Sequence, residues 1–183
     1  MTKGKVCLFI VFSFLAMRAS SQLYYTKNGD ISFFSKSVLQ NIEADNNQVI
    51  SVLNTQTGAL QFSLLNNAFQ FEKAKMQEDF NDNYIESDKY PRSFFKGNIT
   101  NLQAVNFSQD GTYNVNVIGD LTIHGVTKHI STPATITIKN GNISGKSVFH
   151  ILVKDYNIDI PTIVSKKVAD NIEVRVNCTY QPK

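Results

Sequence analysis

Long stretches of this sequence alternate apolar and polar residues with a period of two. From Thr112 to Ile123 one set of alternate positions is mostly valine, leucine, isoleucine and tyrosine, while the other is mostly asparagine, aspartate and threonine. The same alternation continues over residues 126–138 and returns from Val168 to Tyr180. Successive side chains of a strand point to opposite faces, so the pattern predicts strands with one dry and one wet face, as in antiparallel sheets.

Turn-forming dipeptides separate these runs. Asn140-Gly141 lies between 126–138 and 143–153, and this pair is a strong signal for a β-hairpin. Further strand-like runs cover 29–35, 42–54, 59–66 and 92–101. Together the runs predict an all-β fold, a single closed antiparallel β-barrel of about eight strands. Pro133 falls inside a run and predicts a bulge or a sheet corner, because proline cannot donate to a strand ladder.

Residues 73–86 break the alternation. Met76, Phe80 and Tyr84 recur at helical spacing, so one face of a short α-helix would be apolar. We expect this helix to cap one end of the barrel.

The N-terminus is typical of an export signal. Lys3 and Lys5 precede an apolar run from Val6 to Met17, and small residues follow up to Ser21. This pattern predicts a signal peptide over residues 1–21, removed after Ser21, and therefore a periplasmic or secreted protein. A retained membrane anchor or a buried helix is the alternative. After removal, the remaining domain, 22–183, is not expected to be an integral membrane protein.

The composition of residues 22–183 argues against nucleic-acid binding and against an intramolecular disulfide. The formal charge of +3 comes from the basic residues of 1–21, so residues 22–183 have no net charge, which argues against nucleic-acid binding. The same segment keeps one cysteine, Cys178, so an intramolecular disulfide is excluded. This cysteine is on the apolar side of its predicted strand, and we expect an inert core thiol.

Catalytic and metal-binding patterns are missing from the sequence. There is no nucleophile-elbow, dinucleotide or phosphate-loop motif. The histidines have no cysteine or carboxylate at zinc spacing, and the acidic residues of the predicted helix lack a calcium-loop frame. The sequence therefore predicts no enzyme activity, no metal and no cofactor.

Large aromatic residues dominate the apolar positions: Phe33, Phe62, Phe69, Phe71, Phe94, Phe95, Tyr113 and Phe149. Barrels of about eight strands either fill with side chains or hold one small ligand. A solid core is therefore one interpretation, and an elongated lipophilic cavity is the other. For the second we expect the lining to include Phe33, Phe62, Phe69, Phe71, Met76, Phe80, Phe95, Tyr113, Val115, Val117, Phe149 and Ile151.

Several segments resemble the YceI-like family, which is often called polyisoprenoid-binding. They are MQEDFNDNYIESDKYP at 76–91, the F-x-G at 95–97 and VIGDLTIHGVTKHI at 117–130. The resemblance implies an exported, lipocalin-like barrel that encloses a long isoprenoid or similar lipid and has no established catalysis. It also implies that His124, Gly125 and Lys128 of the HGVTK turn determine the fold.

Two other functions remain open at this point. Alternation does not say which side of a barrel is apolar, so a small outer-membrane β-barrel is one alternative. The charged segment 73–86 and the lack of tryptophan argue against it. An isoprenoid-processing enzyme is a weaker alternative, because no acid, base or metal constellation supports it. The natural ligand and the oligomeric state are not predicted.

Overall fold

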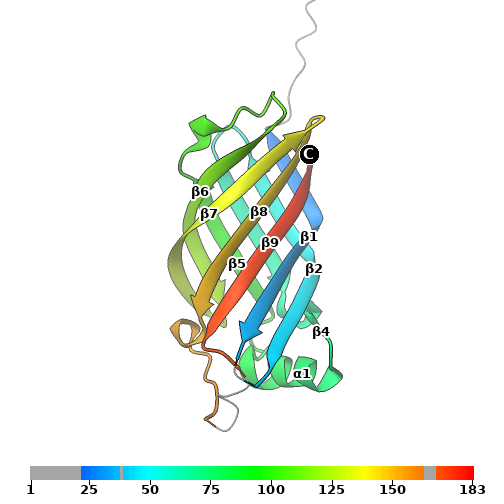
Figure 1. Cartoon of the computed structure of the whole chain (residues 1–183), viewed down its shortest axis with the longest axis vertical. Helices are drawn as coiled ribbons and strands as arrows, with labels where there is room; N and C mark the ends of the chain where they lie inside the picture. Colours follow the sequence, from blue (N-terminus) through cyan, green and yellow to red (C-terminus); the bar gives the residue numbers. More distant parts are fainter. Residues whose placement is uncertain (1–21, 38, 163–167) are drawn as a thin grey trace, which may run out of the picture.

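The computed structural model describes residues 22–37, 39–162 and 168–183, so the predicted signal peptide lies outside the described residues. Eight long strands form a closed antiparallel barrel, which confirms the predicted fold class (Figure 1). These strands are β1 (Leu23–Lys36), β2 (Asn41–Asn54), β3 (Ala59–Leu65), β5 (Arg92–Ile99), β6 (Gly111–Ile123), β7 (Val126–Lys139), β8 (Asn142–Leu152) and β9 (Asn171–Pro182).

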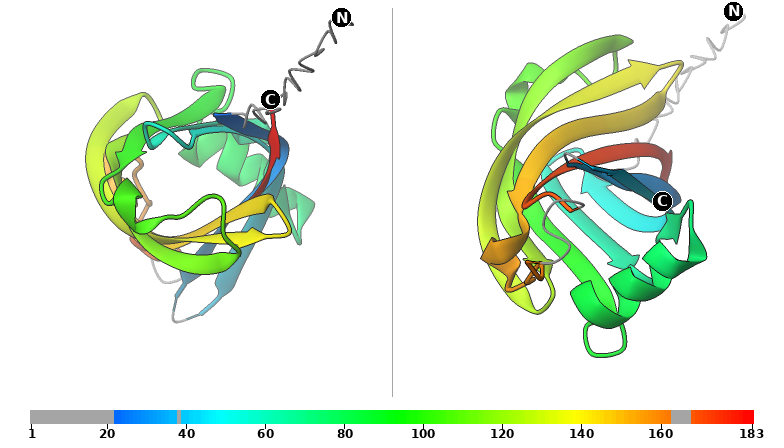
Figure 2. Two further views of the ribbon diagram at one scale, coloured as in Figure 1. Left: turned by 90° about the horizontal axis from the view of Figure 1, so that it is seen from above. Right: turned by 60° about the horizontal axis from the view of Figure 1, so that its bottom comes forward.

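The strands follow one another around the ring in the order β1-β9-β8-β7-β6-β5-β3-β2, and pairing of β1 with β2 closes it. A two-residue strand, β4 (Gln70–Phe71), pairs with β2 near one end. Seen along the barrel axis the ribbons form a ring, and helix α1 lies across one end (Figure 2). Short 3-10 turns complete the connections: η1 (Asn66–Ala68), η3 (Leu102–Ala104) and η4 (Val153–Tyr156).

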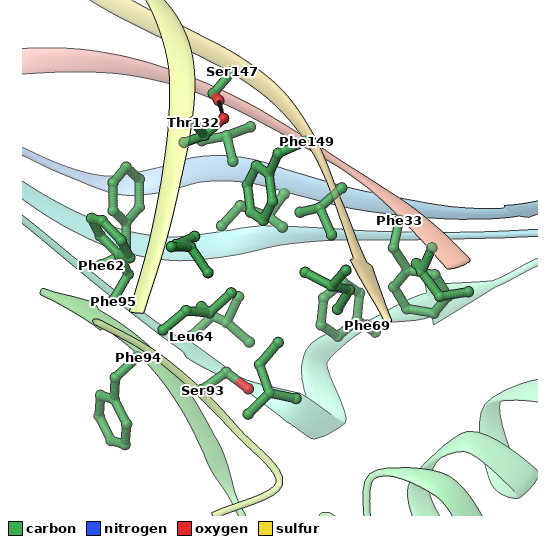
Figure 3. Close-up of a pocket in the computed structure, with 18 of the residues that line it drawn as sticks. Phe33, Phe62, Leu64, Phe69, Ser93, Phe94, Phe95, Thr132, Ser147 and Phe149 are labelled. Atoms are coloured by element: carbon green, nitrogen blue, oxygen red, sulfur yellow. Dashed lines mark hydrogen bonds between the residues drawn. The ribbon is translucent and has the colours of Figure 1, made fainter. Parts of the chain in front are cut away.

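The apolar side of each strand faces the barrel interior. In β6, Val115 and Val117 are buried while Asn114 and Asn116 are exposed. Phe94 does not share the inward face, contrary to the expectation, because its neighbour Phe95 occupies that face. The Phe94 ring is 46% exposed and points away from the interior (Figure 3).

The two hairpin turns that flank β7 each contain two successive residues with positive φ. These pairs are His124-Gly125, with φ of 50° and 72°, and Asn140-Gly141, with φ of 52° and 76°. Two successive residues with positive φ match the tight turns that suit the twist of a hairpin. At Gly125 a side chain is excluded as well, because a Cβ there would be 2.6 Å from the Tyr90 ring.

The ladder between β7 and β8 stops halfway. β7 pairs with β6 along its whole length, and β8 pairs with β9 along nearly all of its length, but β7 and β8 pair only from Lys139↔Asn142 to Ala134↔Ser147. Pro133, which adjoins Ala134 at the end of this ladder, has no N–H to donate. Its carbonyl accepts the Ser147 hydroxyl at 2.8 Å instead of a backbone amide. The expected bulge at Pro133 is absent, since its pairing with β6 is regular.

The capping helix has two parts. α1 (Ala74–Asp79) is α-helical, and η2 (Phe80–Tyr84) continues it as a wider π-helical turn. The Ile85 amide donates to the Phe80 carbonyl at 2.8 Å, five residues back, and Ile85 is buried. The widened turn therefore adds an inward residue that simple helical spacing does not predict.

The end of the barrel opposite α1 is filled by packed side chains. Leu53, Ile138 and Ile143 belong to a buried cluster there, and the β5–β6 connection packs Leu102 and Phe107 against it. The interior is therefore solid toward this end.

Candidate ligand-binding cavity

An apolar cavity of about 460 Å³ occupies the barrel interior between this packed cluster and the capping helix. All eight long strands, the two parts of the helix and the segment after β8 contribute to its lining. Figure 3 shows phenylalanine rings and a few hydroxyl groups projecting into it. The volume lies within the ~300–1,000 Å³ range of sites that enclose one small molecule.

Eleven of the twelve residues expected to line a cavity lie on its wall. They are Phe33, Phe62, Phe69, Phe71, Met76, Phe80, Phe95, Val115, Val117, Phe149 and Ile151. Tyr113 is the exception, because it lies near the packed end, and its hydroxyl donates to the Gln109 carbonyl at 3.1 Å. It packs against the filled cluster rather than the cavity.

Four phenylalanines form an aromatic cluster beneath the helix. The Phe80 ring lies 5.1 Å from Phe71, 5.5 Å from Phe33 and 5.6 Å from Phe69 between centroids. Phe33 also lies 5.3 Å from Phe69. Edge-on and tilted contacts at these distances are favourable for aromatic rings. The cluster therefore fixes η2 on the barrel and forms the cavity wall at this end.

Aliphatic side chains supply much of the remaining wall. Members that the sequence analysis did not single out include Ile31, Ile42, Leu64, Leu121, Ile130, Ile136, Ile158, Ile160, Ile172, Val174 and Val176. Those in strands follow the same alternation as the aromatic residues, so the signal was present in the sequence. Ile158 and Ile160 lie outside any strand, and no periodic pattern marks them.

A small number of polar groups interrupt this apolar lining. The Thr132 and Ser147 hydroxyls lie 3.1 Å apart at the end of the β7–β8 ladder (Figure 3). On β5, the Ser93 hydroxyl donates to the Asn66 side-chain carbonyl at 2.8 Å, and the Asn66 amide donates to the Tyr90 carbonyl at 2.6 Å. All of these hydroxyls already have partners within the protein.

His124 lies outside the cavity. Its side chain connects three segments near the end of the barrel that the capping helix covers. Its Nδ1 donates to the Tyr156 carbonyl at 3.0 Å, and its Nε2 is 2.7 Å from a Glu86 carboxylate oxygen. The ring also packs edge-on against Tyr90, with centroids 4.4 Å apart. The β6–β7 turn, η4 and the end of the capping helix are therefore held together by this one side chain. Lys128 is exposed on β7.

Cys178 and Tyr156 are buried titratable groups that take no part in the cavity wall. Burial raises the pKa of the Cys178 thiol to about 12 and the pKa of the Tyr156 phenol to about 12. Gly29 leaves room for the thiol, because a Cβ at that position would be 2.5 Å from Sγ. The thiol therefore packs as a small apolar group.

The described residues contain neither a cluster of metal-binding side chains nor a helix of membrane-spanning character. No three histidine, cysteine or acidic side chains in this part of the chain lie close enough to hold one metal ion. No helix among residues 22–37, 39–162 and 168–183 is long and apolar enough to cross a membrane.

Comparison with known proteins gives a consistent assignment of fold. The sequence pattern of the YceI-like domain matches residues 20–180. A polyisoprenoid binding domain from Saccharophagus degradans, implicated in plant cell wall breakdown, aligns with a TM-score of 0.76 at 14% identity over 90% of this chain and 100% of that one.

BcnA of Burkholderia cenocepacia aligns with a TM-score of 0.69 at 17% identity, over 84% of this chain and 96% of that one. The YceI protein of Campylobacter jejuni covers both chains completely, with a TM-score of 0.54 at 14% identity. No curated protein sequence matches this chain. At these identities the solved structures establish the shared barrel.

Proposed function

The chain belongs to the YceI-like family, and from this membership and the cavity we propose that it is a non-catalytic protein that encloses the apolar chain of an isoprenoid or similar lipid. The observation that carries the proposal is the apolar space of about 460 Å³ inside a barrel that is otherwise packed. The Saccharophagus degradans relative is described as binding polyisoprenoid, which supports the same ligand class here.

The energy balance requires a long ligand. Burial contributes ~0.8 kcal/mol per carbon, against ~4–15 kcal/mol for association and ordering. About fifteen buried carbons offset the lower end of that cost and leave micromolar affinity. The inward stripes of β6, β7 and β8 give the cavity wall the length that such a chain requires.

The orientation of the strand faces supports this proposal over an outer-membrane barrel. A transmembrane barrel presents an apolar band to the lipid and a polar interior. Here Val115 and Val117 face inward, while Asn114 and Asn116 face outward. An isoprenoid-processing enzyme would need acid, base or metal groups at the ligand, and the charged residues on the described cavity wall are only Asp79 and Lys146.

We further propose that the protein is exported and loses residues 1–21. N-terminal sequencing of protein from the envelope or medium should find Gln22 at the start, in open or cyclised form. A start after residue 30 would contradict this, since it would remove the first part of β1.

The test compares two carboxylates placed on opposite faces of β6. Val117→Asp puts a charge into the cavity wall, so protein purified from its own envelope should lose the lipid found by native mass spectrometry. Burying the carboxylate also lowers stability, so folding is verified by circular dichroism. Asn116→Asp, exposed on the same strand, should retain the lipid. Equal lipid content in both folded variants would refute the carrier proposal.

A further inference from the structure

The Thr132 and Ser147 hydroxyls form a polar point on the largely apolar cavity wall. Thr132 is buried, and both residues line the cavity from facing edges of β7 and β8, where the ladder ends. Their oxygen atoms lie 3.1 Å apart (Figure 3). Pro133, next in the chain, contributes a carbonyl that both hydroxyls reach.

The hydrogens of both hydroxyls are already used. Ser147 Oγ donates to the Pro133 carbonyl at 2.8 Å. Thr132 Oγ1 lies 3.2 Å from the same carbonyl and 3.1 Å from Ser147 Oγ, and both of these neighbours can only accept from it. A hydroxyl has one hydrogen and two lone pairs, so the pair keeps free acceptor sites and has no hydrogen left to donate.

A negatively charged ligand group does not suit this pair, which offers only acceptor sites. Among the described lining residues the charged ones are Asp79 and Lys146. Asp79 is paired with Lys75 at 3.0 Å within α1, and Lys146, the chain neighbour of Ser147, is exposed on β8. A phosphate or carboxylate beside Thr132 would bring only acceptor oxygens to a pair that has no hydrogen left to donate.

We infer that Thr132 and Ser147 accept a hydrogen bond from a hydroxyl group of the bound molecule, so the ligand class is a long-chain isoprenoid alcohol. An ether, aldehyde, ketone or ester offers only acceptors and forms no hydrogen bond with this pair. The inference rests on the proposed function, because it specifies the polar group of the same enclosed chain.

The test uses three probes with the same fifteen-carbon chain: farnesol, farnesyl methyl ether and farnesal. Transfer from water into an apolar cavity favours the ether over farnesol by itself. The ether has an additional methyl group, and it has no hydroxyl hydrogen that must give up a hydrogen bond to water. One neutral hydrogen bond should reverse that order, so farnesol should bind about three- to tenfold more tightly than the ether and the aldehyde by calorimetric titration. Equal affinities of farnesol and the ether would overturn the inference while leaving the proposed function intact. Failure of all three probes to bind would count against the proposed function itself.

Variants assign the preference to the named hydroxyls. Thr132→Val keeps the side-chain shape and should abolish the preference for farnesol over the ether and the aldehyde. Ser147→Ala provides a second route if the first variant folds poorly, and should reduce the preference as well. Thr137→Val, whose hydroxyl contacts Thr112 on the outer face of β7, is the matched control and should keep it. A preference that survives both inward substitutions would overturn the assignment.

Discussion

Gly97 and Gly119 lie directly opposite each other on β5 and β6, and the ring of Phe95 covers both. A Cβ at Gly97 would be 2.6 Å from Phe95 Cζ, and a Cβ at Gly119 would be 2.7 Å from the same atom. The two glycines therefore form a depression in the inner wall that holds the ring. This contact explains the F-x-G at 95–97 in physical terms.

Gly119→Ala should destabilise the barrel, because the added methyl group meets both the Phe95 ring and the backbone of β5. We expect a loss of about 1–3 kcal/mol in the free energy of unfolding, measured with urea. Gly145→Ala is the control, since its Cβ would lie at an ordinary 3.7 Å from Tyr180. A loss that is equal in both variants would mean that strand glycines matter here for a reason other than the ring.

His124→Asn should weaken the junction of the β6–β7 turn, η4 and the capping helix. Asparagine tolerates the left-handed backbone at this position, so the change isolates the lost side-chain contacts from strain. A loss of about 1–3 kcal/mol is expected from thermal or urea unfolding, because the Tyr156 carbonyl loses its donor. His129→Asn removes a similar contact, to Asp120, between side chains that are 68% and 62% exposed, and should change stability by less than about 0.5 kcal/mol. Comparable effects of the two substitutions would contradict the role given to His124.

Phe80→Ala should loosen the capping helix more than the barrel. The ring contacts three other phenylalanines but is only partly buried, so we expect a loss of about 2–3 kcal/mol. Limited proteolysis should then cut within 73–86 before it cuts the strands. Asp82→Ala, on the exposed side of the same turn, should leave the cleavage pattern unchanged. Early cleavage in both variants would show that the aromatic cluster does not hold the helix.

Alkaline pH should destabilise the protein through its buried thiol. The Cys178 pKa is raised from 9.0 to about 12 by burial, so between these values the unfolded chain has lost a proton that the folded chain keeps. The free energy of unfolding therefore falls as pH rises, by about 1.4 kcal/mol for each unit of the interval. Tyr156, with its pKa raised from 10.0 to about 12, acts in the same direction.

Comparison with Cys178→Ala isolates the contribution of the thiol. At pH 8 this variant should be about 1 kcal/mol less stable than the original, because a small buried group is truncated, and ligand binding should persist. The difference should disappear or reverse at pH 10.5, because by then the original protein has lost about 2 kcal/mol through its thiol and the variant has no thiol to ionise. Thr179→Ala, exposed on the same strand, should instead follow the original protein at both pH values. A constant difference between Cys178→Ala and the original would show that the thiol does not titrate with unfolding.

The strands were predictable because their signal is local. Alternation of apolar and polar residues marks β6 from Thr112 to Ile123, and the structure extends the strand by one residue, to Gly111. The same rule, applied strictly, would have placed Phe94 outside, since it precedes inward Phe95. Tyr113 shows the limit of the rule, because strand parity does not distinguish the packed end of the barrel from the hollow part.

Features that depend on distant partners were beyond local patterns. The π-helical turn at 80–84 buries Ile85, and helical spacing alone selects different positions. Pro133 marked an irregularity in β7, but the end of its ladder with β8 depends on Ser147, fourteen residues away. The contacts of His124 with Glu86 and Tyr156 likewise join segments more than thirty residues apart.

The halted ladder between β7 and β8 gives the barrel a line along which side chains, rather than backbone amides, join neighbouring strands. Where the ladder ends, the hydroxyls of Thr132 and Ser147 connect β7 with β8, and η4 also packs against β7. Such contacts exchange with water one at a time, whereas a ladder must open cooperatively. Amide hydrogens on the facing edges of 126–132 and 148–152 should therefore exchange with solvent before those of β6 residues 117–122, which pair with both β5 and β7. Local opening of the barrel wall is therefore expected along this seam.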